Sequence, residues 1–377
     1  MLNAADVPLS LAASLLSSAS IAGLVVITER WHRMITADSL DGIQKVHEHA
    51  TPRIGGLGIY LSLWLAAMLL NDGRDDMLKL LLLAALPALL FGLAEDVTKR
   101  VGIKARLLAT MASGLLAWWL TGYALWRLDI PFVDVILAYA PVAIIFTAFA
   151  VGGVANAINL IDGFNGLASG TLLICLTGLG VLAASQGDLE LARVIFVIGA
   201  ATLGFFLLNF PFGRLFLGDG GAYMLGFLLA WLAVMIAMRH PDTISPAAVL
   251  LICSYPVLET VFSMLRRARR GQKVDHPDRM HMHSLVYRRL VPKLLRKLCN
   301  KPQGTLCNAA TAPIMWLFCA MPVAAGVYFH DNTFACWVAL GVTAIAYDTI
   351  YRRLSQFRWV VLGIPLSARA HGRSHTH

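Results

Sequence analysis

Residues 156–167 read Asn-Ala-Ile-Asn-Leu-Ile-Asp-Gly-Phe-Asn-Gly-Leu, and they stand between two long apolar runs, 134–151 and 167–184. Three amides, a carboxylate and two glycines are costly at the edge of a membrane span, where polar groups are usually functional. A polar turn that only breaks the helix is the alternative. We expect a loop at the centre of an active site, on which four other polar loops converge.

The composition is that of a membrane protein. Of the 377 residues, 58% are hydrophobic and 14% are charged, whereas soluble proteins carry about a quarter charged residues. The net charge of +9 is typical of cytoplasmic loops near anionic headgroups, so it does not indicate nucleic acid binding. The six cysteines show no CxxC spacing, and we interpret them as small apolar side chains rather than a disulfide framework or a zinc site.

Transmembrane helices need about 20 apolar residues. The sequence predicts an all-α, polytopic integral membrane protein with ten to eleven such helices, of which the region 134–165 is the least clear. The candidate spans are roughly 9–28, 54–71, 78–94, 106–122, 134–151, 166–184, 193–209, 221–238, 246–264, 311–329 and 333–350.

Lys and Arg gather in one set of connections, which predicts an N-terminus outside and a C-terminus in the cytoplasm. The same connections hold nearly every unusual polar cluster. We therefore predict one transmembrane catalytic domain, 1–353, and a cytoplasmic tail, 354–377, that is mostly disordered. The inward loops lie near 30–56, 92–106, 152–167, 209–221 and 265–305.

The segment 285–298 in the last inward loop mixes apolar residues with cations. This pattern is typical of a helix on the membrane surface. Pro292 falls inside it, so we expect two short helices. A solvated basic linker is the alternative.

The first two inward loops offer an anion site and a metal site. In the first, cations precede Gly55 and Gly56. Amides freed by glycine at a helix start can bind an anion, although such a pair also serves helix packing. In the second, Glu95 and Asp96 end an apolar helix, where adjacent carboxylates need a partner or a metal such as Mg²⁺. Pairing with the cations that follow is the alternative.

The other loops add further candidates. Amides in the central stretch can discriminate bases and acetamido groups, and Asp162 can bind a metal or a substrate cation. Asp219 stands among glycines at the start of a span, as a metal ligand or as a helix N-cap, and Phe216 can stack on a base. His281 and His283 are spaced for an extended or turn conformation. They suit diphosphate or sugar contacts, with Zn²⁺ or a solvated pair as alternatives.

Five motifs follow in one order: H-x-x-x-x-P-R-x-G-G, G-x-x-[acid]-D, N-A-x-N-x-x-D-G-x-[DN]-G-L, F-x-G-D and H-x-H. From about residue 45 to 290 the chain resembles the polyprenyl-phosphate N-acetylhexosamine-1-phosphate transferases, and its third and fourth motifs are the most specific. The resemblance implies transfer of a sugar 1-phosphate from a UDP-N-acetylhexosamine to polyprenyl (undecaprenyl) phosphate. UMP is released and Mg²⁺ or Mn²⁺ is used. It also implies a multi-pass enzyme of the bacterial inner membrane that begins a cell-envelope polysaccharide such as O-antigen.

The resemblance also implies roles for single residues. Catalytic roles fall on Glu95, Asp96, Asp162 and Asp219, and Asp219 and Asp96 are the implied metal ligands. The implied substrate-binding residues are Lys45, His47, Arg53, Lys104, Asn156, Asn159, Gly163, Asn165, Phe216, Arg279, His281 and His283.

Three positions depart from the family pattern. The acidic pair is Glu95-Asp96 instead of Asp-Asp, Asn165 replaces a second acid, and Ser284 replaces a third histidine. Asn165 cannot act as a base. The rival hypotheses are a transporter, which the one-sided polar clusters disfavour, and a non-catalytic homologue. The sugar, the lipid length and the oligomeric state stay open, with a homodimer as one option.

Overall fold

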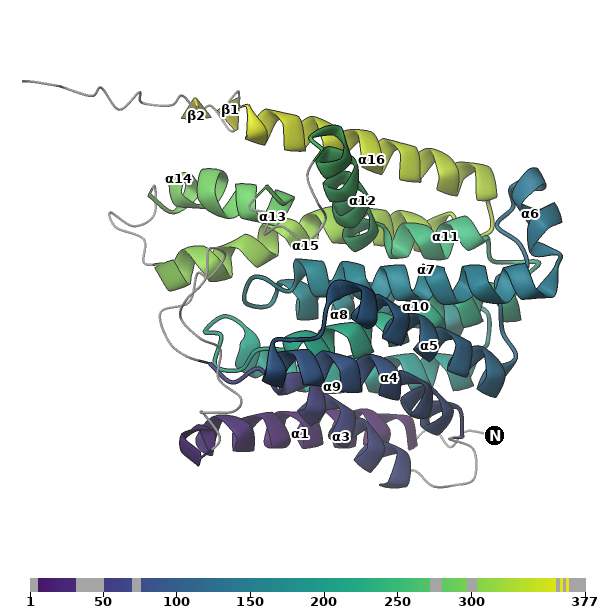
Figure 1. The fold of residues 1–377 in the computed structure, drawn as a ribbon, viewed down its shortest axis with the longest axis horizontal. Coiled ribbons are helices and arrows are strands. Elements are labelled where there is room, and N and C mark those ends of the chain that lie inside the picture. Colours follow the sequence, from purple (N-terminus) through teal and green to yellow (C-terminus); the bar gives the residue numbers. More distant parts are fainter. Residues whose placement is uncertain are drawn as a thin grey trace, which may run out of the picture.

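The protein is described by a computed structural model, which covers residues 6–31, 51–69, 76–271, 280–296, 304–356, 360–361 and 364–365. Helices make up almost all of it, and two short strands, β1 (Val360–Val361) and β2 (Ile364–Pro365), pair antiparallel near the C-terminus. The long helices, with the exception of α12 (Ser254–Arg269), lie side by side along roughly one direction (Figure 1). They are α1 (Asp6–Ile27), α3 (Gly55–Leu69), α4 (Asp76–Thr98), α5 (Ile103–Thr121), α7 (Ala140–Ile161), α8 (Leu167–Ser185), α9 (Leu189–Asn209), α10 (Gly218–Arg239), α12 (Ser254–Arg269), α15 (Gly304–Tyr328) and α16 (Thr333–Ser355).

Shorter helical pieces join the long ones. They are α6 (Pro131–Leu137), α11 (Pro246–Ile252), α13 (Met282–Leu285), the π-helix η1 (Val286–Leu290) and α14 (Val291–Arg296). Among the described residues, eight helices are long and apolar enough to cross a membrane, or nine if the bent pair α11–α12 forms one span. In their described residues all eleven predicted runs overlap helices, so the prediction of a helical, multi-pass protein is confirmed. The count of eleven spans and the sides of the termini stay predictions.

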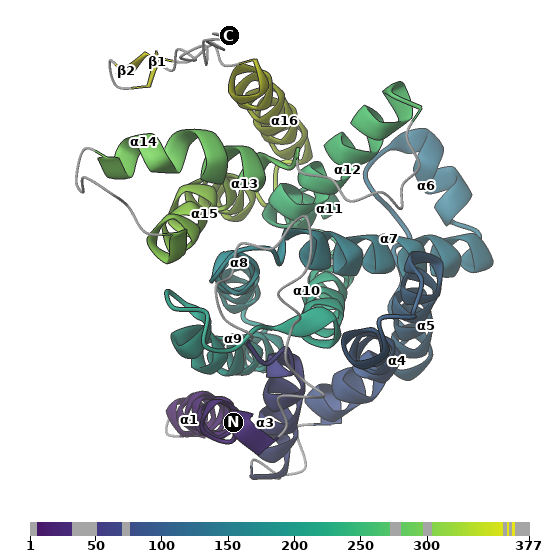
Figure 2. The same cartoon turned by 60° about the vertical axis from the view of Figure 1, so that its left-hand side comes forward.

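Helix α10 lies at the centre of the bundle, with α3, α4, α7 and α8 around it (Figure 2). Of its apolar stretch, 94% is buried inside the molecule. Glycines allow this: a Cβ on Gly56 would lie 2.1 Å from the Cα of Gly221, and one on Gly92 would lie 2.5 Å from the Cα of Gly220. Small residues let membrane helices approach closely and gain van der Waals contact. Gly55 and Gly56 thus serve helix packing, the alternative noted from the sequence.

Two predicted boundaries need correction. The predicted span at 134–151 begins inside α6, and the true helix, α7, continues to Ile161, so residues 156–161 are helical rather than a loop. The predicted span 246–264 is two helices bent by 79° at Cys253. In α7 the helix tolerates its amides because neighbouring groups satisfy them: the Asn156 amide donates to the carbonyl of Gly152, 2.8 Å away.

The basic segment near 285–298 is helical over its described part, in agreement with the prediction. Its break is a π turn, in which the Val291 N–H donates to the Val286 carbonyl. Pro292 has no N–H to give to the preceding turn, which explains why the regular helical ladder is interrupted just there.

Candidate active site

One end of the bundle collects the polar loops. The turns from α4 to α5, from α7 to α8 and from α9 to α10 all lie there, together with the start of α3, on the left in Figure 1. The sequence-based prediction that these loops lie on one side is therefore confirmed for the described residues.

A short ladder of backbone hydrogen bonds joins two of these loops. The Phe216 N–H donates to the Pro52 carbonyl at 2.9 Å, the Gly55 N–H to the Phe216 carbonyl at 3.0 Å, and the Gly56 N–H to the Leu217 carbonyl at 2.9 Å. The two glycine amides are thus occupied, and the anion site predicted on them is wrong. Their role is to fix Arg53 beside the start of α10.

Asp219, in the first turn of α10, is held by two arginines. Arg106 Nη1, from α5, forms a hydrogen bond and ion pair with Asp219 Oδ2. Arg53 Nη2 lies 3.6 Å from Asp219 Oδ1. Both arginine side chains keep some exposed surface, 15% for Arg106 and 26% for Arg53, so a bound anion can reach them. Sequence reasoning assigned no role to Arg106; its place two residues after Lys104 was the available signal.

Asp96 caps α10 from a neighbouring helix. Its Oδ1 accepts from the Asp219 N–H and its Oδ2 from the Gly220 N–H, each at 3.0 Å. Arg53 Nε lies 3.7 Å from Asp96 Oδ1. A carboxylate at a helix N-terminus satisfies amides that have no partner inside the helix. Asp96 therefore positions Asp219 and Arg53 together.

Glu95 turns the other way. Its Oε2 accepts from the Val101 N–H at 2.7 Å, which closes the turn between α4 and α5. Its Oε1 lies 4.0 Å from Arg106 Nη1. The extra methylene relative to aspartate is used in spanning this turn, so Glu95 supports Arg106.

Asp162 follows the last residue of α7 and stands at the edge of the same cluster. Burial raises the pKa of Asp162 to about 7; Arg53 opposes this shift, and the charges of Asp219 and Asp96 add to it. Because burial is the main cause of this shift, a cation bound next to Asp162 would favour the ionised form of its carboxyl group.

Two side-chain amides of α7, those of Asn156 and Asn159, contact residues that lie next to this cluster. Asn156 donates to the Thr110 hydroxyl at 3.2 Å, and Asn159 accepts from the Tyr223 hydroxyl at 3.0 Å. The Tyr223 ring lies under the Arg106 guanidinium, 5.8 Å from its centroid. Asn159 thus acts on the site through Tyr223 and Arg106, whereas Asn156 joins α7 to α5. Tyr223 was not predicted, although it follows Asp219 by one helical turn.

The turn after Asp162 is pinned by buried amides. Asn165 is 3% exposed; its side-chain amide donates to the Pro211 carbonyl at 3.0 Å, and its N–H donates to Asn308 Oδ1 at 2.9 Å. Asn209 Oδ1 accepts from the Gly166 N–H at 2.7 Å. These contacts tie the loops before α8 and α10 to α15, and Asn209 and Asn308 are residues that sequence reasoning missed.

The predicted histidine pair lies beside this turn. The rings of His281 and His283 stack with centroids 5.2 Å apart. The His283 ring contacts the Phe164 ring, with 5.6 Å between centroids. Glu259 on α12, 1% exposed, lies 3.1 Å from His281 Nδ1. Glu259 was missed because it falls inside a run that was assigned as a plain span.

The remaining predicted residues divide into three groups. Phe216 is half-buried, and Gly163 and Lys104 are exposed near the cluster. Lys45, His47 and Arg279 lie outside the described residues.

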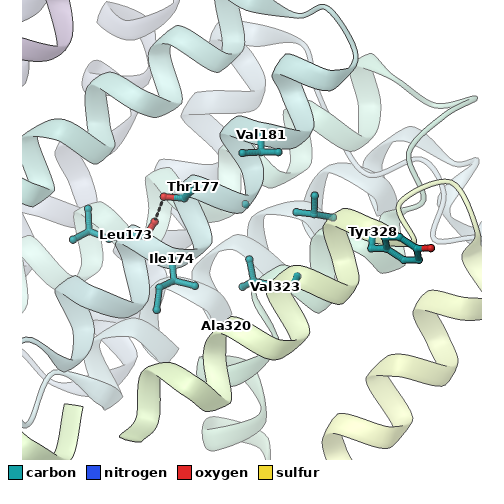
Figure 3. Close-up of a pocket in the computed structure, with 10 residues that line it drawn as sticks. Leu173, Ile174, Thr177, Val181, Ala320, Val323 and Tyr328 are labelled. Atoms are coloured by element: carbon teal, nitrogen blue, oxygen red, sulfur yellow. Dashed lines mark hydrogen bonds between the residues drawn. The ribbon is translucent and has the colours of Figure 1, made fainter. Parts of the chain in front are cut away.

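A large hollow elsewhere does not serve this chemistry. A cavity of about 740 Å³ lies between α8 and α15. Its lining is apolar, and the Thr177 hydroxyl is used within α8, where it donates to the Leu173 carbonyl at 2.7 Å (Figure 3). It suits a lipid chain rather than a sugar nucleotide.

The donor set of the carboxylate cluster fits a hard cation. Within the described ranges, no three His, Cys, Asp or Glu side chains are arranged as a metal site. Mg²⁺ needs less protein: it usually takes one or two carboxylates, with waters and substrate phosphates completing its shell. Asp219 and Asp162 are oxygen donors of this kind, whereas both oxygens of Asp96 already accept backbone N–H groups.

The sequence pattern of glycosyl transferase family 4 matches residues 78–237, the region that carries Asp96, Asp162 and Asp219. A transferase of Salmonella typhi, named undecaprenyl-phosphate alpha-N-acetylglucosaminyl 1-phosphate transferase, is 30% identical over 249 residues, which are 65% of this chain and 67% of the relative. The chain belongs to glycosyl transferase family 4. The resemblance inferred from the motifs is thereby confirmed.

Two further members of family 4 are similar to it. A probable undecaprenyl-phosphate N-acetylglucosaminyl 1-phosphate transferase of Bacillus subtilis is 28% identical over 240 residues, 64% of this chain and 66% of the relative. The Yersinia pestis undecaprenyl-phosphate alpha-N-acetylglucosaminyl 1-phosphate transferase is 28% identical over 249 residues, which are 65% of this chain and 68% of the relative. The matched regions thus span about two thirds of the length of these relatives.

Proposed function

We propose that this chain transfers an N-acetylhexosamine 1-phosphate from a UDP-sugar to polyprenyl phosphate. The observation that carries the proposal is the cluster in which Arg53 and Arg106 both bind Asp219, beside Asp96 and Asp162. The relatives' names, which specify undecaprenyl phosphate and N-acetylglucosaminyl 1-phosphate transfer, support the same reaction.

In the reaction, an oxygen of the lipid phosphate forms a bond to the phosphorus that carries the sugar. The bond from that phosphorus to the UMP oxygen breaks, and UMP leaves with the electron pair. Nucleophile and target are both anionic, so the site must hold them in line and neutralise charge. Arg53 and Arg106 would exchange part of their contact with Asp219 for the phosphates, since guanidinium groups bind phosphate oxygens in pairs.

Mg²⁺ is part of the proposal, with Mn²⁺ as a substitute. Asp219 and Asp162 would hold the ion, and Asp96 would keep Asp219 in place. The bound ion supplies screening of the diphosphate charge. The carboxylates need not remove a proton, because a lipid phosphate is already ionised at neutral pH.

The site would face the cytoplasm of a bacterial inner membrane, with the N-terminus outside and the C-terminus inside. Support comes from the positive-inside rule and from the place of Lys99, Arg100 and Lys104 at the same end as the carboxylate cluster. The product would begin a cell-envelope polysaccharide such as O-antigen. A homodimer stays a prediction.

The test is release of UMP by the purified protein with Mg²⁺, polyprenyl phosphate and a panel of UDP-sugars. We expect release with a UDP-N-acetylhexosamine and its loss in Asp219→Asn. The matched control is Asp188→Asn, which changes a buried carboxylate at the other end of the bundle, 2.9 Å from Arg239, and should keep turnover. No UMP from any donor would contradict the proposal; full turnover in Asp219→Asn would contradict the assigned role of Asp219.

A further inference from the structure

Two residues other than glycine adopt a left-handed backbone conformation in the part of the chain that the structure describes. They are Lys99, with a φ of 55°, and Asp129, with a φ of 59°. This conformation brings Cβ close to the following carbonyl oxygen, so it is unfavourable for a residue with a side chain and easy for glycine. Each of the two side chains should therefore make a contact that glycine could not make.

For Asp129 the contact lies within the fold. Its Oδ2 accepts from the Thr333 hydroxyl at 2.8 Å and from the Ser245 hydroxyl at 3.1 Å. Its Oδ1 lies 3.6 Å from Arg127 Nε. These contacts join the segment before α6 to the starts of α11 and α16, at the end of the bundle away from the candidate active site. The side chain of Asp129 thus stabilises the structure, which explains its backbone conformation.

For Lys99 no such contact exists. It directly follows α4, and its N–H donates to the Glu95 carbonyl at 2.9 Å. Helices commonly end in this way, with glycine at the left-handed position. Glycine would make the same hydrogen bond without strain. The Lys99 side chain is exposed, and within the described part of the chain it forms no hydrogen bond or ion pair.

Two further cations of the same turn have exposed side chains without a partner among the described residues, Arg100 and Lys104. An exposed cation at the same end of the bundle shows the contrast. Arg352, in the last turn of α16, has its Nε 2.7 Å from Asp348 Oδ2. The turn between α4 and α5 therefore carries three positive charges that no acid of the described chain neutralises.

Exposed apolar side chains surround these cations. Val97 is 53% exposed, Ile103 is 40% exposed and Leu108 is 64% exposed. Leu108 follows Lys104 by four residues, so the two lie on one face of α5. Helix α5 runs beside α4 at the outer edge of the bundle (Figure 2). Cations mixed with apolar groups where an apolar helix ends match a lipid with an anionic headgroup, because the stems of such cations cover apolar surface while their charges reach the headgroups.

The same turn supports the candidate active site. Glu95 Oε2 accepts from the Val101 N–H at 2.7 Å and closes the turn, and Glu95 Oε1 lies 4.0 Å from Arg106 Nη1. A ligand that holds the turn therefore also holds the carboxylate that faces Arg106.

We infer that Lys99, with Arg100 and Lys104 beside it, binds the phosphate of an anionic phospholipid in the membrane leaflet next to the turn between α4 and α5. This lipid is distinct from the acceptor of the proposed reaction. Its charge is complementary to the three cations, and its acyl chains fit the exposed apolar side chains. The lysine is kept in a left-handed conformation because a glycine there would lose the headgroup contact.

Native mass spectrometry of the purified protein in a neutral detergent tests the inference. It measures the dissociation constants of the first bound phosphatidylglycerol and of phosphatidylcholine with the same acyl chains. We expect the wild type to bind phosphatidylglycerol more tightly. Lys99→Ala should weaken that binding about fivefold, which corresponds to about 1 kcal/mol for one cation near anionic lipid, and should leave phosphatidylcholine unchanged. Lys99→Arg should keep the wild-type value.

Lys99→Gly separates the role of the side chain from that of the backbone. This variant removes the charge and relieves the left-handed conformation. It should weaken phosphatidylglycerol binding as Lys99→Ala does, and it should raise the melting temperature by about 1–2 °C. A lysine that only ends α4 predicts the same rise with unchanged lipid binding, and that result overturns the inference.

Two controls match the two properties of Lys99. Asp129→Gly relieves the same backbone conformation but loses the hydroxyl contacts of Thr333 and Ser245, so it should lower the melting temperature and leave lipid binding unchanged. Arg352→Ala removes an exposed cation that Asp348 already pairs, so it should also leave lipid binding unchanged. Equal weakening in Arg352→Ala and Lys99→Ala would show that net charge alone attracts the lipid, which contradicts the assigned contact.

Competition distinguishes the sources of phosphate. Neither inorganic phosphate nor polyprenyl phosphate should displace the phosphatidylglycerol whose binding depends on Lys99. Displacement by polyprenyl phosphate would assign this surface to the acceptor lipid, and displacement by inorganic phosphate would show a simple ion site. Either result overturns the inference.

The binding measurements need no turnover, so they remain decisive if the wild type releases no UMP. One further expectation rests on the proposed function. The rate of UMP release should rise with the phosphatidylglycerol content of the membrane, and it should rise less in Lys99→Gly because the turn that carries Glu95 is no longer held. An unaltered dependence on phosphatidylglycerol in Lys99→Gly would contradict the inference.

Discussion

Where α8 meets α9, Asp188 accepts from the Leu191 N–H at 3.2 Å and lies 2.9 Å from Arg239 and 3.0 Å from His240. At the other end of the bundle, Asp96 and Asp219 both lie beside Arg53, and Asp219 also pairs with Arg106.

The two ends differ in charge balance. At the Asp188 end, one buried acid has two basic partners and also caps a helix, so its charge is satisfied within the fold. Among the described residues at the Asp219 end, the acids Glu95, Asp96, Asp162 and Asp219 outnumber the two arginines that face them. A buried acid whose charge is paired, as at the Asp188 end, stabilises the fold. An excess of buried acids, as at the Asp219 end, is typical of a site that binds a ligand.

The largest effect should come from the arginines that distinguish the two ends. Arg106→Ala should lower UMP release about 100- to 1000-fold, the cost of removing a group that stabilises charge in the transition state. Arg239→Ala should leave turnover near the wild-type value. Assays with equal amounts of folded protein check both, and equal losses in the two variants would erase the distinction between the ends.

The close crossing of α3 and α10 near the candidate active site should not tolerate an added Cβ atom. Gly56→Ala should lower the free energy of unfolding by about 1–3 kcal/mol or more, because its Cβ would meet the Cα of Gly221 at 2.1 Å. Gly153→Ala is the control, since nothing lies within 4 Å of its added Cβ. Thermal unfolding in detergent measures both. A neutral Gly56→Ala would mean that α3 and α10 are farther apart than described.

A substitution at Asn165 tests whether this position has a structural role, as an amide, or a catalytic role, as an acid. Asn165→Asp removes the donor to the Pro211 carbonyl and buries a charge, so it should cost about 1–3 kcal/mol of stability. Asn332→Asp should be neutral, because either side chain caps α16. The unfolding midpoints of the Asn165→Asp and Asn332→Asp variants measure this difference in stability. An Asn165→Asp variant with higher turnover and wild-type stability would show that the position belongs to the chemistry.

The smallest effect concerns pH. The pKa of Asp162 is raised from 3.8 to about 7, chiefly by burial, so the folded protein holds this proton more tightly than the unfolded chain does. Stability should therefore fall as pH rises through that window. With EDTA present, Asp162→Asn should remove part of this fall, so that its melting temperature exceeds that of the wild type at pH 8 but not at pH 4. Parallel curves would contradict the burial of this carboxyl group.

Sequence alone determined the helical membrane fold, the common side of the polar loops and the family. These follow from local properties: apolar runs of span length predict helices wherever they occur, and the motifs at Asp96, Asp162 and Asp219 keep their order and spacing along the chain.

Only the tertiary structure decided which groups share a contact. The ladder between Pro52 and Phe216, the cap that Asp96 gives to α10 and the hold of Glu259 on His281 each join distant parts of the chain. Helix packing sets such partners, and an apolar run that contains one acid gives no local sign of what that acid will meet. The helical end of α7 was mistaken for a loop for the same reason, because Asn156 and Asn159 find their partners on α5 and α10.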